Sequence, residues 1–166
     1  MGDRLQIREA TQQDIIEVSK TSISMGLKDF PPKISYTYAL DDNGIILCVG
    51  GFLLVTPTVG WVWMDMAEAA RSNIYKVYRA IREWIQQYTH DLCITRLMAA
   101  VNPDFEEAVR TIDHLGFRLE SVMEAFDDDK AFHMYVWIAP KTHTIAPGST
   151  RVSLDVHTVV SEGGEV

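Results

Sequence analysis

Apolar and polar positions alternate near the N-terminus, and this pattern predicts a strand followed by a helix. Leu5 and Ile7 are each flanked by polar residues, which is the period-2 pattern of a strand with one buried face. Thr11 follows, with Asp14 three residues later, a spacing typical of a capping box at a helix start.

Three further apolar runs are rich in β-branched and aromatic residues and predict consecutive antiparallel strands, at residues 34–40, 44–55 and 61–66. Asn43 and Gly44 join the first two runs and tolerate the positive φ of a tight hairpin turn. Gly50 and Gly51 predict a bulge or a close approach of another backbone segment. Trp61, Trp63 and Asp65 are expected on one face of the third strand and Val62, Met64 and Met66 on the other.

After Ala67 the apolar period becomes helical, which predicts the longest helix. Its apolar stripe comprises Ile74, Val77, Tyr78, Ile81, Ile85 and Tyr88. A strand at residues 93–101 follows. Another helix is expected after it, because Pro103 fits the first turn of a helix and Asp104 and Glu107 have the spacing of a capping box.

Gly116 can adopt the left-handed conformation that ends this helix, and residues 117–126 and 131–138 predict a second hairpin. The order β-α-β-β-β-α-β-α-β-β predicts an α/β protein, with helices on both faces of a central mixed sheet in one domain, residues 1–140. Residues 141–166 are expected to form a C-terminal tail, which is either an assembly arm that pairs with another subunit or a partner protein, or a disordered terminus.

Composition excludes some classes of function. The net charge of -8 disfavours nucleic acid, because phosphate binding needs a basic surface. No apolar run approaches the roughly 20 residues of a membrane span. Cys48 and Cys93 lie in apolar runs and are expected to be buried, reduced thiols, so we expect a cytoplasmic protein.

At residues 102–117, an Asn-containing loop leads into a helix that ends in Leu-Gly-Phe before a strand. This arrangement resembles the GNAT family of acetyl-CoA-dependent N-acetyltransferases, and the order of elements agrees from about residue 5 to residue 138. The resemblance implies a GNAT-like fold in which the strand at 61–66 splays from the strand at 96–101 to admit acetyl-CoA.

The resemblance also assigns candidate cofactor residues. In GNAT enzymes the splayed strand lends backbone groups to the pantetheine arm, which implicates Met64 and Met66. The next helix begins in that family with a Gln/Arg-x-x-Gly-x-Gly/Ala loop that binds the pyrophosphate. The matching residues here are Arg71, Ser72 and Asn73.

Three positions depart from the family's pattern. Ile74 and Lys76 replace the glycine and the small residue of the loop and would narrow the approach of a diphosphate. The family's frequent general acid, a tyrosine, falls on Ile112, which cannot donate a proton. These departures predict weak or absent binding of acetyl-CoA.

Other residues have a functional and a structural interpretation. Asp65 ends its strand where a general base can lie in this fold, or it is a cap or a solvated acid. Asn102 orients a pantetheine amide or only introduces the helix. Trp61, Trp63 and Trp84 line a ligand cleft or belong to the core. The histidines show no metal-ligand spacing, so no metal is expected.

Two functions follow. The first is acetyl-CoA-dependent N-acyl transfer to an amine near Asp65. The second is a catalytically inactive GNAT-fold protein for binding or assembly, similar to the small GNAT-like proteins of short-tailed phages, one class of which are internal virion proteins. On that second interpretation the protein lies in the host cytoplasm or the virion.

Overall fold

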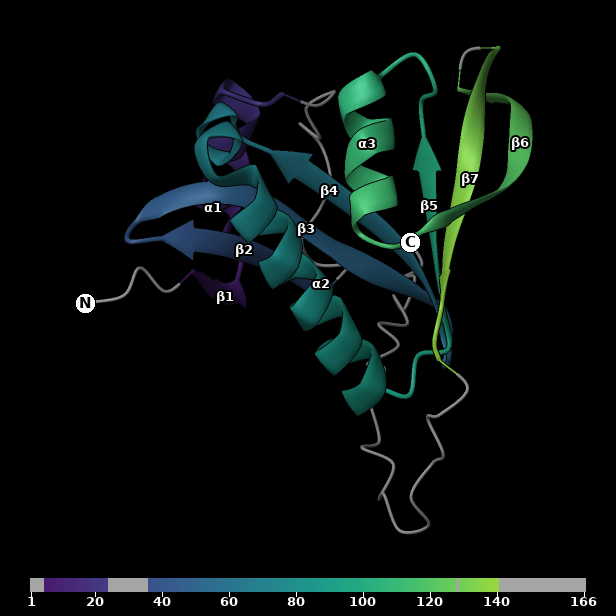
Figure 1. The fold of residues 1–166 in the computed structure, drawn as a ribbon, viewed down its shortest axis with the longest axis horizontal. Helices are drawn as coiled ribbons and strands as arrows, with labels where there is room; N and C mark the ends of the chain where they lie inside the picture. The colour runs from purple at the N-terminus through teal and green to yellow at the C-terminus, as the bar shows by residue number, and fades with distance from the viewer. Residues whose placement is uncertain (1–4, 24–35, 128, 141–166) are drawn as a thin grey trace, which may run out of the picture.

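The computed structural model describes residues 5–23, 36–127 and 129–140, and Figure 1 shows their arrangement. The elements follow in the order β1 (Gln6–Glu9), α1 (Gln12–Lys20), β2 (Tyr36–Asp42), β3 (Ile45–Thr56), β4 (Val59–Met66), a 3-10 helix (Glu68–Asn73), α2 (Ile74–Asp91), β5 (Arg96–Val101), α3 (Glu106–His114), β6 (Arg118–Asp127) and β7 (Lys130–Ile138). The predicted α/β class and the predicted order of strands and helices are confirmed.

The strands of the described residues belong to one seven-stranded sheet in the order β1-β2-β3-β4-β5-β7-β6. Neighbouring strands are antiparallel except β4 and β5, which are parallel. A parallel pair needs a long crossover, and α2 provides it. The sheet is therefore mixed, as predicted, and its one parallel pair lies near the middle.

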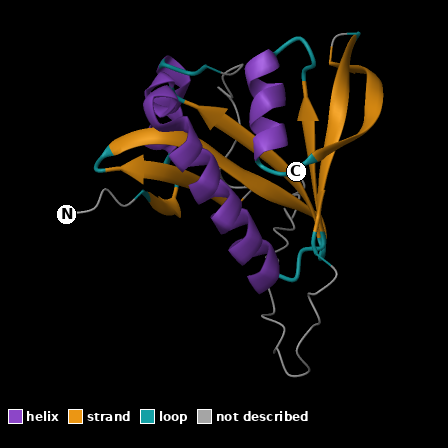
Figure 2. Ribbon diagram, viewed as in Figure 1, coloured by secondary structure: helices purple, strands orange, loops and turns teal. Residues whose placement is uncertain are grey.

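Helices cover both faces of the sheet (Figure 2). Ile15 and Val18 of α1 pack on a cluster that contains Ala39 and Val49. The larger cluster on the opposite face comprises apolar side chains of α2, α3 and the sheet, including Leu40. Since Ala39 and Leu40 are neighbours in β2, the period-2 alternation sends them to opposite faces.

Several local predictions are confirmed. Thr11 and Asp14 form a capping box at the start of α1. Asn43 and Gly44 have positive φ values of 53° and 91° in the hairpin turn, and Gly116 has a φ of 88° after α3. Glycine adopts a positive φ without strain because it has no Cβ atom, and asparagine tolerates it better than most residues.

The two adjacent glycines of β3 meet the backbone of neighbouring strands. A Cβ atom at Gly51 would lie 1.8 Å from the carbonyl oxygen of Tyr36, and one at Gly50 would lie 2.9 Å from that of Trp63. The close approach is confirmed, whereas the register of β2 and β3 is regular at these two residues. The register shift in this pair lies between Leu40 and Asp41.

Two expectations are wrong. The capping box at Asp104 and Glu107 does not form, because Asn102 Oδ1 accepts the Asp104 amide at 3.0 Å and makes a turn of its own, so that α3 begins only at Glu106. Cys93 is exposed rather than buried. It lies in the turn between α2 and β5 with a φ of 55°, which interrupts the strand pattern that suggested burial.

The tail at residues 141–166 lies outside the described residues, as does the proline-containing segment at residues 24–35. Among the described residues, no helix is long and apolar enough to cross a membrane.

Candidate functional site

The parallel strands β4 and β5 are paired at only one end. Val59, Gly60 and Trp61 pair with residues 96–98 of β5, and the two strands are not paired beyond that point. β4 continues beside β3, while β5 continues beside β7. Figure 1 shows the two strands diverging from their common end. The predicted splay is confirmed.

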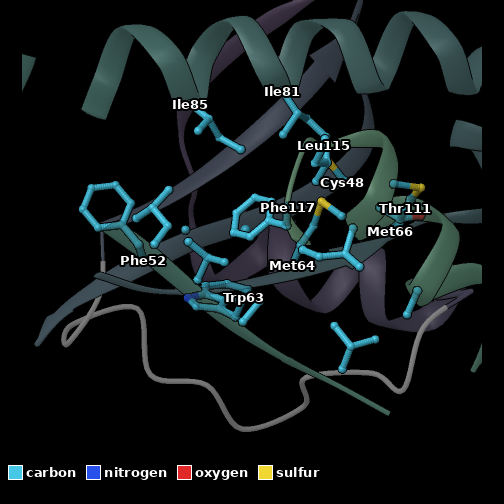
Figure 3. Close-up of a pocket in the computed structure, with 18 of the residues that line it drawn as sticks. Cys48, Phe52, Trp63, Met64, Met66, Ile81, Ile85, Thr111, Leu115 and Phe117 are labelled. Carbon is cyan, nitrogen blue, oxygen red and sulfur yellow. The ribbon is translucent and has the colours of Figure 1, made fainter. Parts of the chain in front are cut away.

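A pocket of about 540 Å³ occupies the region between the diverging strands, α2 and α3. Figure 3 shows side chains of α2, β3, β4 and α3 around it, including Ile81, Cys48, Met64 and Thr111. Most of the lining is aliphatic or aromatic. This volume falls within the roughly 300–1,000 Å³ of small-molecule sites.

Few polar side chains line the pocket, and most of them lie where the strands have separated. They include Asn102, Glu107, Thr111 and Asp127, and the hydroxyls of Tyr38, Tyr88 and Thr89 also belong to the lining. The Thr111 hydroxyl is hydrogen-bonded to the Tyr78 hydroxyl at 3.1 Å, which joins α3 to α2. The lining is thus mainly apolar, with a small number of polar side chains.

An ion pair lies at the mouth. Arg71 Nη2 donates to Glu107 Oε1 at 2.7 Å, and Glu107 lines the pocket. Arg71 belongs to the 3-10 helix that leads directly into α2. No side chain caps the N-terminus of α2, where main-chain N–H groups favour an anion.

The candidate cofactor residues divide into two groups. Met64, Met66 and Asn102 line the pocket. Arg71, Ser72 and Asn73 are exposed on or beside the 3-10 helix and lie outside the lining. Through its ion pair with Glu107, Arg71 is nevertheless connected to the mouth.

Asp65 lies apart from both groups. Its side chain is only 2% exposed, it is absent from the pocket lining, and it accepts a hydrogen bond from Ser22 Oγ at 2.5 Å. Met64 and Met66, its neighbours in β4, face the core cluster of α2. Asp65 is therefore a buried, hydrogen-bonded acid and not the solvated acid of the structural interpretation.

The two residues expected to obstruct a diphosphate differ in their surroundings. Ile74 packs against the larger core cluster, while Lys76 is exposed. Ile74 therefore directs its bulk towards the core, and Lys76 offers positive charge at the surface of the first turn of α2. Ile112 is buried and lines the pocket.

Trp61, Trp63 and Trp84 all line the pocket, and Trp63 and Trp84 also pack against the core clusters, so the structure does not separate the ligand interpretation from the core interpretation. Sequence reasoning missed several other lining residues: Tyr38, Phe52, Tyr88, Glu107, Thr111, Phe126 and Phe132. Aromatic residues in strand and helix patterns resemble core residues, so no sequence signal separated the two roles. Among the described residues, no cluster of three or more His, Cys, Asp or Glu side chains could hold a metal ion.

No family model matches the sequence, and no curated protein matches it either. Solved structures do match the fold. A GNAT-family acetyltransferase from Streptococcus pneumoniae is 15% identical, with a TM-score of 0.63 over 82% of this chain and 100% of that one. The ribosomal-protein-S18-alanine N-acetyltransferase from Escherichia coli is 11% identical, with a TM-score of 0.64 over 86% and 99% of the two chains.

A third similar structure is a ribosomal L7/L12 alpha-N-protein acetyltransferase in complex with coenzyme A. It is 13% identical, with a TM-score of 0.66 over 83% of this chain and 96% of that one. The protein has the GNAT fold. At these identities the likeness establishes the GNAT architecture, and function has to be argued from the site.

Proposed function

We propose that the protein transfers an acyl group from a coenzyme A thioester to an amine. The separation of β4 and β5 beyond Trp61 carries the proposal, because it opens the sheet into a pocket of ligand size. The similar structures named above are acetyltransferases, and one was solved with coenzyme A. This likeness of fold supports the reaction class by analogy.

The pocket suits such a donor chemically. The edge of β4 that faces β5 is not paired with it beyond Trp61, so its backbone can hydrogen-bond the amides of a pantetheine arm. Asn102 lines the same region. Arg71 and Lys76 flank the start of α2, where cations and main-chain N–H groups favour the diphosphate.

The proposed reaction has a simple balance. The amine nitrogen attacks the thioester carbonyl carbon, a C–N bond forms and the C–S bond breaks. The nitrogen loses one proton and the departing sulfur gains one. Asp65 is our candidate acceptor of the first proton, although it is buried, accepts a hydrogen bond from Ser22 and is not part of the pocket lining.

Thiol release tests this function. The protein is mixed with acetyl-CoA and a panel of amines, including peptides with free α-amino groups, and free coenzyme A is followed with a chromogenic thiol reagent. We expect release that requires both substrates and that falls at least about tenfold in Asp65→Asn. Equal release with and without protein for every amine would contradict catalysis.

A second candidate function is binding or assembly without catalysis, such as that of an internal virion protein from a short-tailed phage. Ile112 favours this candidate, because it lines the pocket at the position of the family's tyrosine acid and cannot donate a proton. Coenzyme A binding without amine-dependent thiol release would select this function over the first.

A further inference from the structure

The pocket continues well beyond the diverging ends of β4 and β5. Its lining includes residues of α2 from Ile81 to Tyr88, and also Phe52 of β3 and Leu97 of β5. At about 1.5 Å per residue, the seven-residue separation of Ile81 and Tyr88 corresponds to about 10 Å along α2. Figure 3 shows Ile81, Ile85 and Phe52 around this part of the pocket.

A cluster of aromatic rings lines the pocket beside the C-terminal half of α2. The Tyr38 ring lies 4.7 Å from that of Trp84 and 5.2 Å from that of Tyr88. The Phe52 ring lies 5.6 Å from that of Tyr88. The cluster joins β2, β3 and the C-terminal half of α2, so rings from three elements contact one another along this part of the lining.

Three hydroxyls at this end are hydrogen-bonded within the protein. The Tyr38 and Tyr88 hydroxyls are hydrogen-bonded to each other, and the Thr89 hydroxyl donates to the carbonyl oxygen of Ile85 at 2.6 Å. A polar ligand would lose its hydrogen bonds to water without replacement here. An apolar ligand has no such cost and gains the transfer of its surface out of water.

We propose that the acyl group of the donor is a medium-length aliphatic chain, which lies beneath α2 with its end against the aromatic cluster. The inference rests on the proposed function and names its substrate class. The stretch of α2 from Ile81 to Tyr88 is about 10 Å long, and an extended chain of about eight carbons has a similar length. An acetyl group would leave this apolar volume unfilled.

Cys48 lines the cavity, and its chemistry is compatible with a thioester nearby. Burial raises the pKa of its thiol to about 12. The thiol is therefore protonated at neutral pH and does not attack the thioester carbonyl, because the nucleophile in such an exchange is the thiolate.

Calorimetric titration of the full chain with coenzyme A, acetyl-CoA, hexanoyl-CoA and octanoyl-CoA tests the inference. Each buried methylene contributes about fourfold at most, and part of this is lost in ordering the chain. We expect octanoyl-CoA to bind at least about 50-fold more tightly than acetyl-CoA. Equal affinities for the two thioesters would overturn the inference and leave the proposed function intact. Absence of binding by all four compounds would overturn both.

A cavity-filling variant locates the chain. Cys48→Phe puts a ring into the cavity, and we expect it to reduce the ratio of octanoyl-CoA to acetyl-CoA affinity at least about tenfold. Cys93→Phe is the matched control, because Cys93 is exposed, and its ratio should equal that of the original protein. Ile85→Phe provides a second filled cavity if Cys48→Phe does not fold. An unchanged ratio in the filled variants would overturn the placement.

Discussion

Arg71 and Glu107 face each other at the mouth of the pocket, with Arg71 Nη2 2.7 Å from Glu107 Oε1. The pair joins the 3-10 helix before α2 to the first turn of α3. Both side chains are well exposed, at 54% and 38%, so the pair adds little to the stability of the fold. On the proposed function, the pair matters for the electrostatics of the mouth. Glu107 neutralises the positive charge of Arg71, which would otherwise attract the diphosphate of coenzyme A.

Charge changes at this pair should therefore act in opposite directions on coenzyme A affinity. Arg71→Ala is expected to weaken binding about tenfold, because one charge-assisted hydrogen bond to phosphate is lost. Glu107→Gln is expected to strengthen binding about two- to fivefold, because a negative charge leaves the mouth. Isothermal titration calorimetry at low salt measures both effects.

Matched controls lie on the same helix. Arg110 and Glu106 form another exposed pair on α3, with a separation of 3.9 Å, and neither residue lines the pocket. Arg110→Ala and Glu106→Gln should change the affinity less than twofold. If these controls matched the effects of Arg71→Ala and Glu107→Gln, only the overall charge would matter and the proposed diphosphate position would be wrong.

Asp14 should make the stability of the protein depend on pH. Its carboxylate accepts two hydrogen bonds from Arg8, at 2.8 and 2.9 Å, and it closes the capping box with Thr11. Chiefly through the Arg8 hydrogen bond, the pKa of Asp14 is lowered from 3.8 to about 2. A lowered pKa in the folded state adds stability above the unfolded value, and this stability is lost as pH falls towards about 2.

Asp14→Ala should therefore cost about 1–2 kcal/mol at pH 7. The difference in unfolding free energy from the original protein should shrink between about pH 4 and pH 2. Denaturant unfolding at pH 7, 4 and 2.5 measures this. Glu17→Ala, an exposed change on the same helix, should have little effect at any pH. If the difference in unfolding free energy between Asp14→Ala and the original protein did not vary with pH, the ion-pair explanation would be refuted.

Much of the fold follows from short-range patterns. The hairpin at Asn43 and Gly44 and the capping box at Thr11 depend on a few adjacent residues, so their physics is visible in the sequence. The predicted start of α3 is wrong because the side chain of Asn102 has two local options: it can introduce the helix, or it can form a turn of its own. Sequence alone does not rank those options, since the side chain of Asn can hydrogen-bond nearby backbone groups in more than one local conformation.

Gly51→Ala is expected to be one of the most damaging single substitutions in the sheet. Its Cβ would lie 1.8 Å from the carbonyl oxygen of Tyr36, and two paired strands cannot separate at one residue without breaking the ladder. We expect a loss of about 3 kcal/mol. Gly60→Ala is the comparison, because its Cβ would meet the flexible end of Leu97 at 3.0 Å, and it should cost about 1 kcal/mol. Similar melting temperatures for the two variants would contradict this.

The tail at residues 141–166 remains a separate prediction. We propose that the alternating piece at residues 151–156 adds to a sheet edge of another subunit or partner, because a lone strand is not stable in water. A chain that ends at Pro140 should keep its melting temperature and lose self-association, as seen by light scattering. Unchanged assembly would remove the arm hypothesis, and a collapsed melting temperature would place the tail in the core.

The site was less predictable than the fold. Met64, Met66 and Asn102 were named from the resemblance, and they line the pocket. The aromatic cluster could not be foreseen, because Trp84 and Tyr88 follow the same helical pattern whether they fill a core or line a cavity. Asp65 was ambiguous for a related reason, since its partner Ser22 lies 43 residues away in sequence, and no local pattern reports such a contact.

Calorimetric titration of the unmodified protein with acetyl-CoA at neutral pH tests most directly whether the splayed strands hold a coenzyme A thioester. We expect one site per chain with a dissociation constant of about 10 µM to 1 mM, or about −7 to −4 kcal/mol. Binding should be weaker than micromolar for two reasons. Glu107 holds the guanidinium group of Arg71 in an ion pair, and the acetyl group leaves the cavity beneath α2 unfilled. No detectable binding of acetyl-CoA or of the longer thioesters at millimolar concentration would contradict the proposed function, and a dissociation constant for acetyl-CoA below about 1 µM would contradict the weakening that we assign to the Arg71–Glu107 pair.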